Sequence, residues 1–391
     1  GSDAQVTLLE KMPRPARKVM ITGKGRCNLT NVKDWNEFSA HIRSNPNFVK
    51  SAFYTLPPEA LLDWFAMFGM RSVVERGDRA FPESYRASDV VDTLVNACNS
   101  LGVKIVCEAE VESVKPGFTL ALSDGAVWNC RTLILATGGL SYPGTGSSGD
   151  GLRWAEELGH KIEPTFPSLT ALVPRGYKLV EGKGLHIDRS TALSPLGEKL
   201  CGVHLKNISL SLEIGGTDAG TEFGDIDFTD GGLEGPLGFQ LSRKAVKSML
   251  NGARVSLSLD LKPGVSLTEL TERVGQLWKE VDKDPRSVRL REKEKCRILL
   301  GKLMPWDLIP AFVEMNPGIM TLERRSRTDT KLWVNLPTIA KALKSWRFDI
   351  AGFVGYERAV VTAGGVSSES VVAKTMASRV VPGLFFCGEV L

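Results

Sequence analysis

The residues best suited to do chemistry lie in one polar stretch, residues 18–31, whose first part is a short apolar run. It contains two glycines, one arginine, one cysteine and two asparagines, namely Gly23, Gly25, Arg26, Cys27, Asn28 and Asn31. Glycine admits positive φ and lets a ligand approach the backbone, and the planar guanidinium of arginine suits phosphate or carboxylate. The pattern predicts an anion-binding turn, although a glycine turn with solvent-facing polar side chains has the same local signature.

An acidic residue ends the strand-like run that precedes this stretch. Residues 6–9 read Val-Thr-Leu-Leu, which is typical of a buried strand, and Glu10 follows directly. In a dinucleotide-binding fold the second parallel strand ends on an acid that accepts hydrogen bonds from ribose hydroxyls. Glu10 is therefore a candidate ribose ligand. Because the glycine-rich phosphate loop lies about 20 residues upstream of such an acid, we expect that loop outside the given sequence.

The composition is that of an ordinary globular protein. A length of 391 residues favours two or three domains, and 42% hydrophobic with 24% charged residues is a typical balance. The net charge of +4 is mild and gives no warrant for nucleic-acid binding. No apolar run approaches the ~18 residues that a membrane span needs, so we expect no membrane association.

Seven cysteines and four histidines are dispersed along the chain without any C-x-x-C pair or metal-ligand spacing. Dispersed cysteines favour a reducing compartment, and we expect a cytoplasmic protein. The acidic, glycine-rich stretch 223–236 lacks the spacing and terminal glutamate of an EF-hand, so no metal site is expected. No nucleophile elbow is present either. No catalytic side chain is assigned, and the chemistry must come from a cofactor.

The order of apolar patterns predicts an α/β fold with a Rossmann-like, dinucleotide-binding domain that is interrupted by an insertion. The first segment spans residues 1–164, the insertion 165–350 and the second segment 351–391, because proline-rich character begins at Pro164 and buried-strand runs ending on glycine return near the end. Within the insertion, short alternating strands predict a β-barrel at about 165–260, and amphipathic patterns predict helices at about 266–335. We expect a substrate-side unit that can be removed without unfolding the rest.

Several local patterns place the glycine motifs on elements. Residues 133–136 form an apolar run that ends on Thr137-Gly138-Gly139, which is typical of a parallel strand presenting ligands at its carboxyl end. Asp124-Gly125 predicts a tight hairpin turn, and Asp150 is expected to be the N-cap of the next helix. An amphipathic helix is predicted over 266–281, and another from Pro337 through Trp346.

A family resemblance is carried by residues 8–11 and 23–31, which read Leu-Leu-Glu-Lys and Gly-Lys-Gly-Arg-Cys-Asn-Leu-Thr-Asn. Two later parts agree with it, residues 136–139 with 145–151 and residues 361–366 with 388–391. Together they are similar to the BaiN-like family of FAD-dependent flavoproteins, NAD(P)/FAD-dependent oxidoreductases that include aminoacetone oxidases. Three features depart from the family pattern: Lys24 replaces a usual third glycine, and the phosphate loop and an acidic, glycine-rich end are not in the sequence. We therefore expect the chain as given to bind FAD poorly.

The resemblance implies a set of cofactor-binding residues. Around the ribose acid it implies Glu10 and Lys11, and in the flavin-proximal turn it implies Gly23, Gly25, Arg26, Cys27, Asn28 and Asn31. It implies that the backbone of Val111 meets the adenine, and that Thr362, Gly364 and Gly365 face the isoalloxazine. The cofactor would also be lined by Ala136, Thr137, Gly138, Gly139, Gly388 and Glu389. Cys27 is either a redox thiol or an inert, close-packed cysteine.

Two functions follow from this reading. In the first, the protein is a flavin-dependent oxidoreductase that moves hydride between FAD and a small organic substrate, by reducing an activated C=C bond or by oxidising an amine, with NAD(P)H as a candidate electron donor. In the second, it is a non-catalytic flavoprotein relative that works as a binding module, with RNA contacted through the charge-rich residues 286–302. Nucleic-acid binding is the disfavoured alternative, and the sequence does not specify an oligomeric state.

Overall fold

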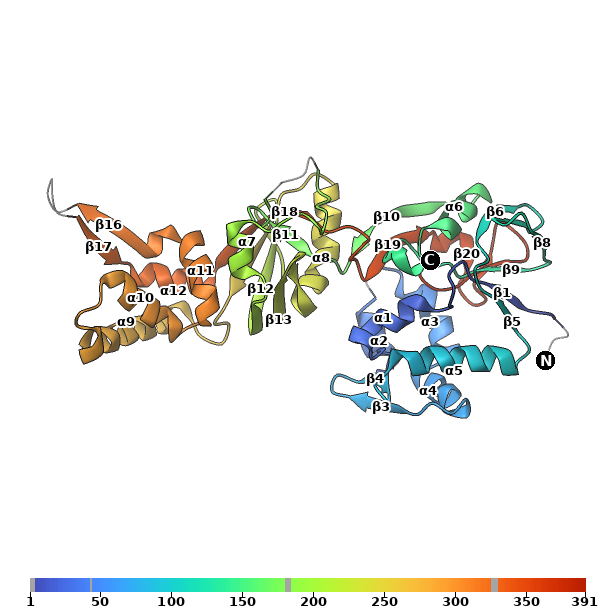
Figure 1. The fold of residues 1–391 in the computed structure, drawn as a ribbon, viewed down its shortest axis with the longest axis horizontal. Helices are drawn as coiled ribbons and strands as arrows, with labels where there is room; N and C mark the ends of the chain where they lie inside the picture. Colours follow the sequence, from blue (N-terminus) through green and yellow to red (C-terminus); the bar gives the residue numbers. More distant parts are fainter. Residues whose placement is uncertain (1–3, 43, 180–183, 325–329) are drawn as a thin grey trace. The chain divides into compact units, whose positions relative to one another are not determined.

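The computed structural model describes residues 4–42, 44–179, 184–324 and 330–391. The chain divides into two compact units (Figure 1), the first made of Gly1–Thr165 and Gly364–Leu391 and the second of Phe166–Ala363. The first unit is therefore discontinuous in sequence. Its second segment begins at Gly364, thirteen residues after the start predicted from the apolar runs, because residues 351–363 still belong to the second unit.

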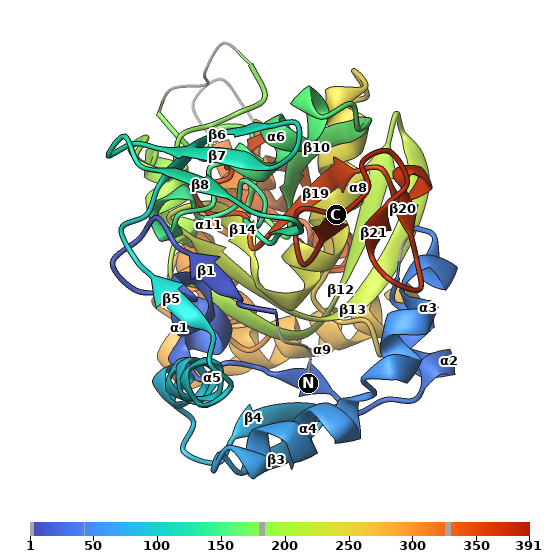
Figure 2. The same cartoon turned by 90° about the vertical axis from the view of Figure 1, so that its right-hand side faces the viewer.

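Two parallel strand pairs form the centre of the first unit. β1 (Thr7–Leu9) pairs with β5 (Lys104–Val106), and β9 (Leu133–Leu135) pairs with β22 (Leu384–Phe386). Figure 2 shows β1 beside β5. Parallel pairs need crossover connections, and the helices of this unit are α1 (Arg17–Ile21), α2 (Trp35–Ala40), α3 (Pro46–Thr55), α4 (Pro58–Met67), α5 (Ala87–Ser100) and α6 (Asp150–Glu157).

Antiparallel ribbons complete the first unit. The sheet β2-β4-β3 consists of Thr30–Asn31, Arg79–Pro82 and Ser72–Glu75, and the meander β6-β7-β8 consists of Val111–Lys115, Thr119–Leu122 and Val127–Asn129. The predicted Asp124-Gly125 turn joins β7 to β8: Gly125 has φ 84°, and the Asp124 carboxylate accepts a hydrogen bond from the amide of Ala126. The strands β20 (Val371–Val372) and β21 (Ala377–Ser378) extend the β22-β9 pair.

A closed six-stranded barrel forms the core of the second unit. Its order is β11-β14-β13-β12-β15-β18, with bounds Leu172–Pro174, Gly232–Glu234, Thr217–Thr229, His204–Ile214, Val255–Asp260 and Trp346–Phe353. The barrel thus confirms the predicted fold class but extends beyond the predicted range of 165–260, since β18 closes it. The helix predicted through Trp346 is wrong at its end: α12 stops at Lys344, and the following side chains alternate as in a strand.

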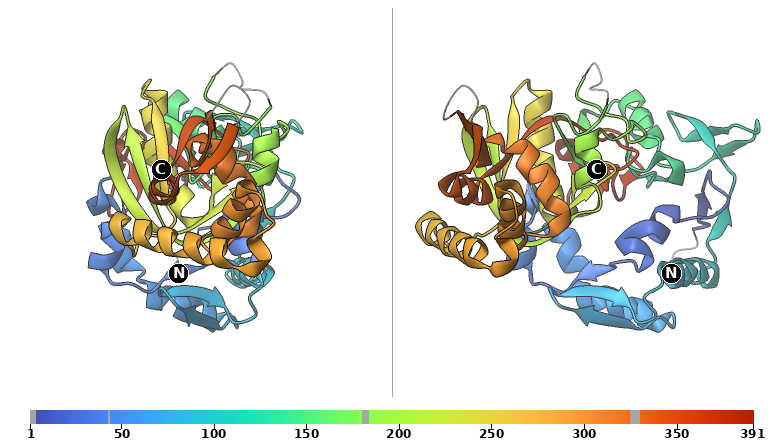
Figure 3. Two further views of the ribbon diagram at one scale, coloured as in Figure 1. Left: turned by 90° about the vertical axis from the view of Figure 1, so that its left-hand side faces the viewer. Right: turned by 60° about the vertical axis from the view of Figure 1, so that its left-hand side comes forward.

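Helices pack against the barrel, and those that follow β15 along the chain are coloured gold to orange in Figure 3. They are α7 (Pro195–Leu200), α8 (Gly235–Leu250), α9 (Leu267–Lys283), α10 (Glu292–Gly301), α11 (Ile309–Met315) and α12 (Leu336–Lys344), with a hairpin of β16 (Met320–Arg324) and β17 (Thr330–Val334). The helix predicted over 266–281 is confirmed as α9, which begins with a capping box between Ser266 and Glu269. Leu267, the first residue of α9, is exposed.

The strands β10 (Ile162–Ser168) and β19 (Val361–Val366) form a two-stranded sheet. They contain both points at which the chain passes from one unit to the other. The predicted removability of the insertion stays a prediction, because the arrangement alone does not measure how each unit folds.

A substitution at Gly232 tests whether β14 packs against β11 in the barrel. Gly232 has φ +127°, and a Cβ there would lie 2.4 Å from the carbonyl oxygen of Leu172. We expect Gly232→Ala to lower the free energy of unfolding by ~3 kcal/mol or more. The control is Gly215→Ala, since Gly215 also has positive φ but open space around the new methyl group, and it should cost about 1 kcal/mol. Chemical denaturation of the full chain measures both. Equal losses would contradict the packing of β14 against β11.

Candidate functional site

The carboxyl ends of β9 and β22 bring two predicted glycine motifs together. The amide of Cys387 donates to the carbonyl of Leu135 at 2.9 Å, so the residues that follow, 136–139 and 388–389, leave the sheet side by side. The carboxylate of Glu389 accepts a hydrogen bond from Lys18 Nζ at 2.8 Å, and both side chains are three-quarters buried or slightly more. This ion pair joins α1 to the end of β22. It places a cation and an acid where a parallel sheet presents its ligands.

Close packing near Thr137 explains why residues 138 and 151 are glycines. A Cβ on Gly151 would lie 2.1 Å from Thr137 Oγ1, and a Cβ on Gly138, which has φ +76°, would lie 2.9 Å from Ser147 Oγ. Only glycine fits at either position without displacing a neighbour. The start of α6 therefore packs directly against the end of β9.

Asp150 is the first residue of α6 rather than its N-cap, so that prediction is wrong; Gly149 is the N-cap, in a left-handed conformation. The Asp150 carboxylate instead binds Lys11 Nζ at 2.7 Å and the Ser148 hydroxyl at 2.6 Å. Burial alone would raise the pKa of Asp150, but the hydrogen bonds from Lys11 and Ser148 outweigh it and lower the pKa below its ordinary value. Asp150 is thus a carboxylate partner for the lysine that follows Glu10.

Glu10 directly follows β1, as the sequence predicts, and is half-buried. One carboxylate oxygen, Oε1, accepts a hydrogen bond from the amide of Met12 at 2.9 Å. The backbone of Glu10 continues the pairing with β5 through the carbonyl of Val106. The side chain is therefore held from one oxygen, and within the described part of the chain the other oxygen is not engaged by a hydrogen bond. A ribose hydroxyl would suit that second oxygen.

Four residues of the turn at 22–27 have backbone angles in the left-handed region. Gly23, Lys24, Gly25 and Cys27 have φ values of 56°, 58°, 84° and 55°. Lys24, which replaces the usual third glycine, accepts this conformation and points an exposed side chain outward. Placing a non-glycine residue in this region has a modest cost in free energy.

Arg26 contacts aromatic and acidic side chains of the first unit. Its guanidinium carbon lies 4.7 Å from the centroid of the Phe81 ring and 5.8 Å from that of Tyr85, and an amino group lies 3.7 Å from the Glu75 carboxylate. Its side chain is 45% exposed. A cation stacked on an aromatic face is held in position while its outer edge stays accessible. The predicted role of Arg26 toward the flavin stays a prediction.

The two asparagines of the turn serve the backbone around them. Asn31 donates from its amide to the carbonyl of Gly77 at 2.9 Å. With its amide nitrogen turned inward, Asn28 donates to the carbonyls of Thr30 and Ala80. The bond to Ala80 reaches β4, and the bond to Gly77 reaches the residues just before it. A structural contribution therefore accompanies any contact that the asparagines make with a cofactor.

The remaining predicted residues lie on two other strands, β6 and β19. Val111 begins β6 and pairs with Leu122 next to a register shift. Gly364 and Gly365 lie on β19, where a Cβ would meet the carbonyl oxygen of Pro164 at 2.4 Å and backbone atoms of Val390 and Leu391 at 2.8 Å. Thr362 is buried and belongs to the second unit. The two glycines are therefore required by the chain itself, and their approach to a flavin stays a prediction.

The predicted set of cofactor-binding residues does not include Lys18, Ser148 and Asp150. Lys18 nevertheless lies within the polar stretch 18–31. Their partners lie far along the chain, 371 residues away for the Lys18 to Glu389 pair and 139 for Lys11 to Asp150. A single sequence carries no signal for such pairs.

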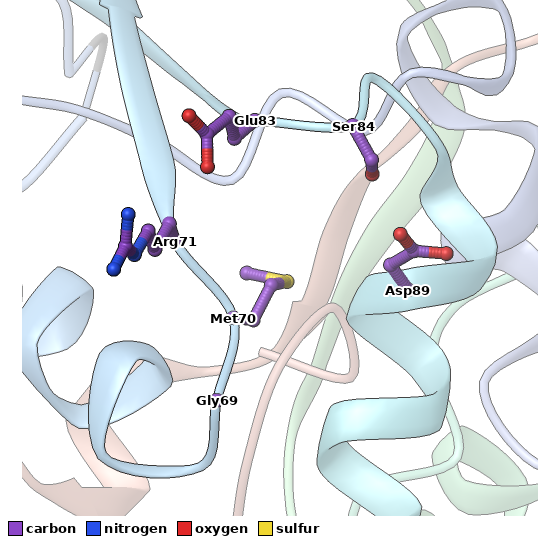
Figure 4. Close-up of a pocket in the computed structure, with 6 residues that line it drawn as sticks. All are labelled: Gly69, Met70, Arg71, Glu83, Ser84 and Asp89. Atoms are coloured by element: carbon purple, nitrogen blue, oxygen red, sulfur yellow. The ribbon is translucent and has the colours of Figure 1, made fainter.

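A hollow of about 350 Å³ lies elsewhere in the first unit, lined by Gly69, Met70, Arg71, Glu83, Ser84 and Asp89. Figure 4 shows Met70 between the ionisable side chains of Arg71, Glu83 and Asp89, with Asp89 on α5. It contains none of the predicted site residues, and a polar, open hollow of this kind lacks the apolar lining of most ligand sites. Among the described residues there is also no cluster of three or more potential metal ligands, and no helix there is long and apolar enough to cross a bilayer.

The residues around β9 and β22 fit the polar parts of FAD. Gly388 has φ +80° and nothing within 4 Å of where a side chain would begin, so the end of β22 leaves space for a ligand close to the backbone. Gly25 is open in the same way. Glu10 offers an acceptor, and Lys11 and Lys18 offer cations that an anionic pyrophosphate requires.

The reactivity of Cys27 distinguishes a redox thiol from an inert one. It is 5% exposed, and burial raises the pKa of its thiol despite a hydrogen bond with Thr22 that lowers it. Because the thiol is buried and its pKa is raised, we expect iodoacetamide to label it roughly tenfold or more slowly than the exposed Cys387 in the folded protein. Timed alkylation with peptide mass spectrometry measures both rates, and equal rates in urea are the control. Equally fast labelling in the folded protein would mean a reactive Cys27.

Comparisons with known proteins identify the family. Residues 1–391 match the family described as HI0933-like protein Rossmann domain. The chain is 27% identical to the 3-dehydro-bile acid delta(4,6)-reductase of Clostridium scindens over 100% of this chain and 87% of that protein. It is 30% identical to the ribosomal RNA dihydrouridine synthase of Escherichia coli over 99% and 86%, respectively. A flavocytochrome c3 fumarate reductase structure aligns with 99% of this chain and 69% of its own, with 16% identity and a TM-score of 0.44. The chain therefore belongs to the HI0933-like family of Rossmann-type, FAD-binding proteins and is a flavin-dependent oxidoreductase, as its BaiN-like motifs predicted.

Proposed function

We propose that this protein reduces a carbon–carbon double bond that is conjugated to a carbonyl group. The observation that carries the proposal is the match of the whole chain to relatives whose names both describe the saturation of such a bond. A delta-4 double bond in a 3-oxo compound is conjugated to the carbonyl, and so is the ring double bond that is lost when uridine becomes dihydrouridine. The shared chemistry favours the reductive direction over amine oxidation of the aminoacetone oxidase type.

The residues of this chain would bind and orient the reactants. FAD, once bound and reduced, supplies the hydride for the carbon remote from the carbonyl. Glu10 would hold the ribose through its second oxygen, and Lys11 and Lys18 would balance the pyrophosphate charge. Arg26 would present the outer edge of its guanidinium to an anionic or carbonyl oxygen, since Phe81 and Glu75 fix its position. No side chain is assigned as the proton donor.

The proposal also includes the remaining expectations. NAD(P)H is the proposed electron donor, and a small organic molecule is the proposed substrate. The seven free cysteines fit a reducing compartment, which supports a cytoplasmic location.

A second candidate substrate is a uracil ring within RNA. The helical layer of the second unit supports it, because residues 286–297 expose five cationic side chains, namely Arg286, Arg289, Arg291, Lys293 and Arg297. Arg286 and Arg291 are paired with neighbouring acids, which reduces the charge available to phosphates. Two relatives named as ribosomal RNA dihydrouridine synthases make this a candidate of its own.

The first test of the proposal uses the flavin as the reporter. The full-length protein is loaded with FAD and reduced without oxygen by dithionite, and 2-cyclohexenone or cyclohexene is then added. We expect only the conjugated enone to restore the oxidised-flavin absorbance, because the carbonyl stabilises the negative charge that hydride addition creates. Reduction of oxidised flavin by aminoacetone, with no response to the enone, would reverse the direction. Dihydrouridine formed in ribosomal RNA, measured by mass spectrometry with the enone inactive, would favour the second substrate.

The second test concerns Lys18. Removing its charge in Lys18→Met leaves Glu389 without this cation beside the expected pyrophosphate, so we expect the FAD dissociation constant to rise by about tenfold. Lys24→Met is the matched control, because Lys24 lies in the same segment, carries the same charge and points to solvent. Fluorescence titration with FAD measures both variants. An equal effect of the two would mean that only the overall charge of this segment matters.

A further inference from the structure

A hollow of about 230 Å³ in the second unit has an apolar floor. It lies where the start of β12, the residues after β15 and the end of α10 meet. Six of its lining residues are apolar and at most 9% exposed: Leu205, Ile208, Leu261, Leu303, Met304 and Leu308. None of them is among the residues assigned to the cofactor. A concave site with an apolar floor is the usual form of a small-molecule site.

A β-bulge in β12 creates this floor. The register of β12 against β13 shifts between Leu205 and Ile208, and Asn207 within the shift has φ +54°. In a regular strand, residues three apart face opposite sides, yet Leu205 and Ile208 are both buried here. The Asn207 amide donates to the Asp225 carboxylate at 3.0 Å, which holds the bulge. A left-handed asparagine at a bulge is a local strain that often accompanies a binding site.

The rim of the hollow is positively charged. His204, Lys206 and Lys262 line it. Three acids of the adjoining strands lie near this rim. Asp225 accepts the hydrogen bond from the backbone amide of Asn207, Asp227 contacts His204 at 2.7 Å, and Asp260 pairs with Lys344. Within the described ranges, the ammonium groups of Lys206 and Lys262 form no ion pair. The hollow therefore combines an apolar floor with two lysines that form no ion pair among the described residues.

We propose that this hollow binds a small anionic amphiphile, a carboxylate that carries a short acyl chain or a single ring. The apolar part would displace water from the leucine and methionine side chains, and the carboxylate would take the two lysines as partners. The volume is below the roughly 300–1,000 Å³ of sites for drug-sized ligands, so a long chain would not be accommodated. The site is independent of the flavin chemistry proposed above.

Calorimetric titration of the full-length protein tests the proposal with octanoate, butanoate and 1-octanol as probes. We expect saturable binding of octanoate, and binding of butanoate and octanol that is weaker by at least about tenfold, since one lacks apolar length and the other lacks charge. Octanol binding as tightly as octanoate would overturn the role of the lysines. Absence of octanoate binding would overturn the site.

Charge reversal locates the binding. The double variant Lys206→Glu/Lys262→Glu should weaken octanoate binding by at least about tenfold. The matched control is Lys247→Glu/Lys279→Glu, which changes the net charge equally at two exposed lysines that do not line the hollow. Circular dichroism verifies that each variant is folded, and the probe comparison above uses the unaltered chain. Equal weakening by the control variant would overturn the assignment to this hollow.

Discussion

The pairing of β22 with β9 is the constraint on which the rest of the structure depends. Leu384 lies beside Leu133 in a parallel pair, although most of the chain separates them. Because two strands must be adjacent to exchange hydrogen bonds, the intervening residues 166–363 have to leave the first unit and return to it. The discontinuous domain is thus the direct consequence of one short parallel pair. The entropy of closing so long a loop grows only slowly with its length, and a folded insertion reduces it further.

The charges of the first unit are also paired over long distances in the sequence. Residues 11–26 contain six lysines and arginines and no acid, so any neutralising partner has to come from another element. Asp150 reaches Lys11 from α6, Glu75 reaches Arg26 from β3, and Glu389 reaches Lys18 from the end of β22. These pairs are only partly buried, and partly exposed pairs contribute little net stability. A cationic segment held by exchangeable partners is well suited to an anionic dinucleotide.

Local patterns predicted the elements whose sequence signals lie within a few residues. The Ser266 to Glu269 capping box, the Asp124-Gly125 turn and the strand before Glu10 all follow from residues within a few positions of one another. Long-range features were not predictable. Trp346, the first residue of β18, was predicted to end a helix because it follows the apolar residues of α12 at helical spacing. Only the neighbouring strands β11 and β15 determine that it is extended. The partners of Lys11 and Lys18 were missed for the same reason.

The glycines show how far a motif can be interpreted without a structure. In sequence, every glycine of the family pattern has the same meaning, a place where a cofactor approaches the backbone. In space they separate into two kinds. At Gly138, Gly364 and Gly365, other atoms of the chain lie within 2.9 Å of the position that a Cβ would take. Gly25 and Gly388 have nothing there. The first kind is required for packing whether or not a flavin is bound, and only the second leaves room that a ligand can occupy. The open glycines at the end of β22 and in the Arg26 turn are therefore the positions from which the cofactor site is best defined.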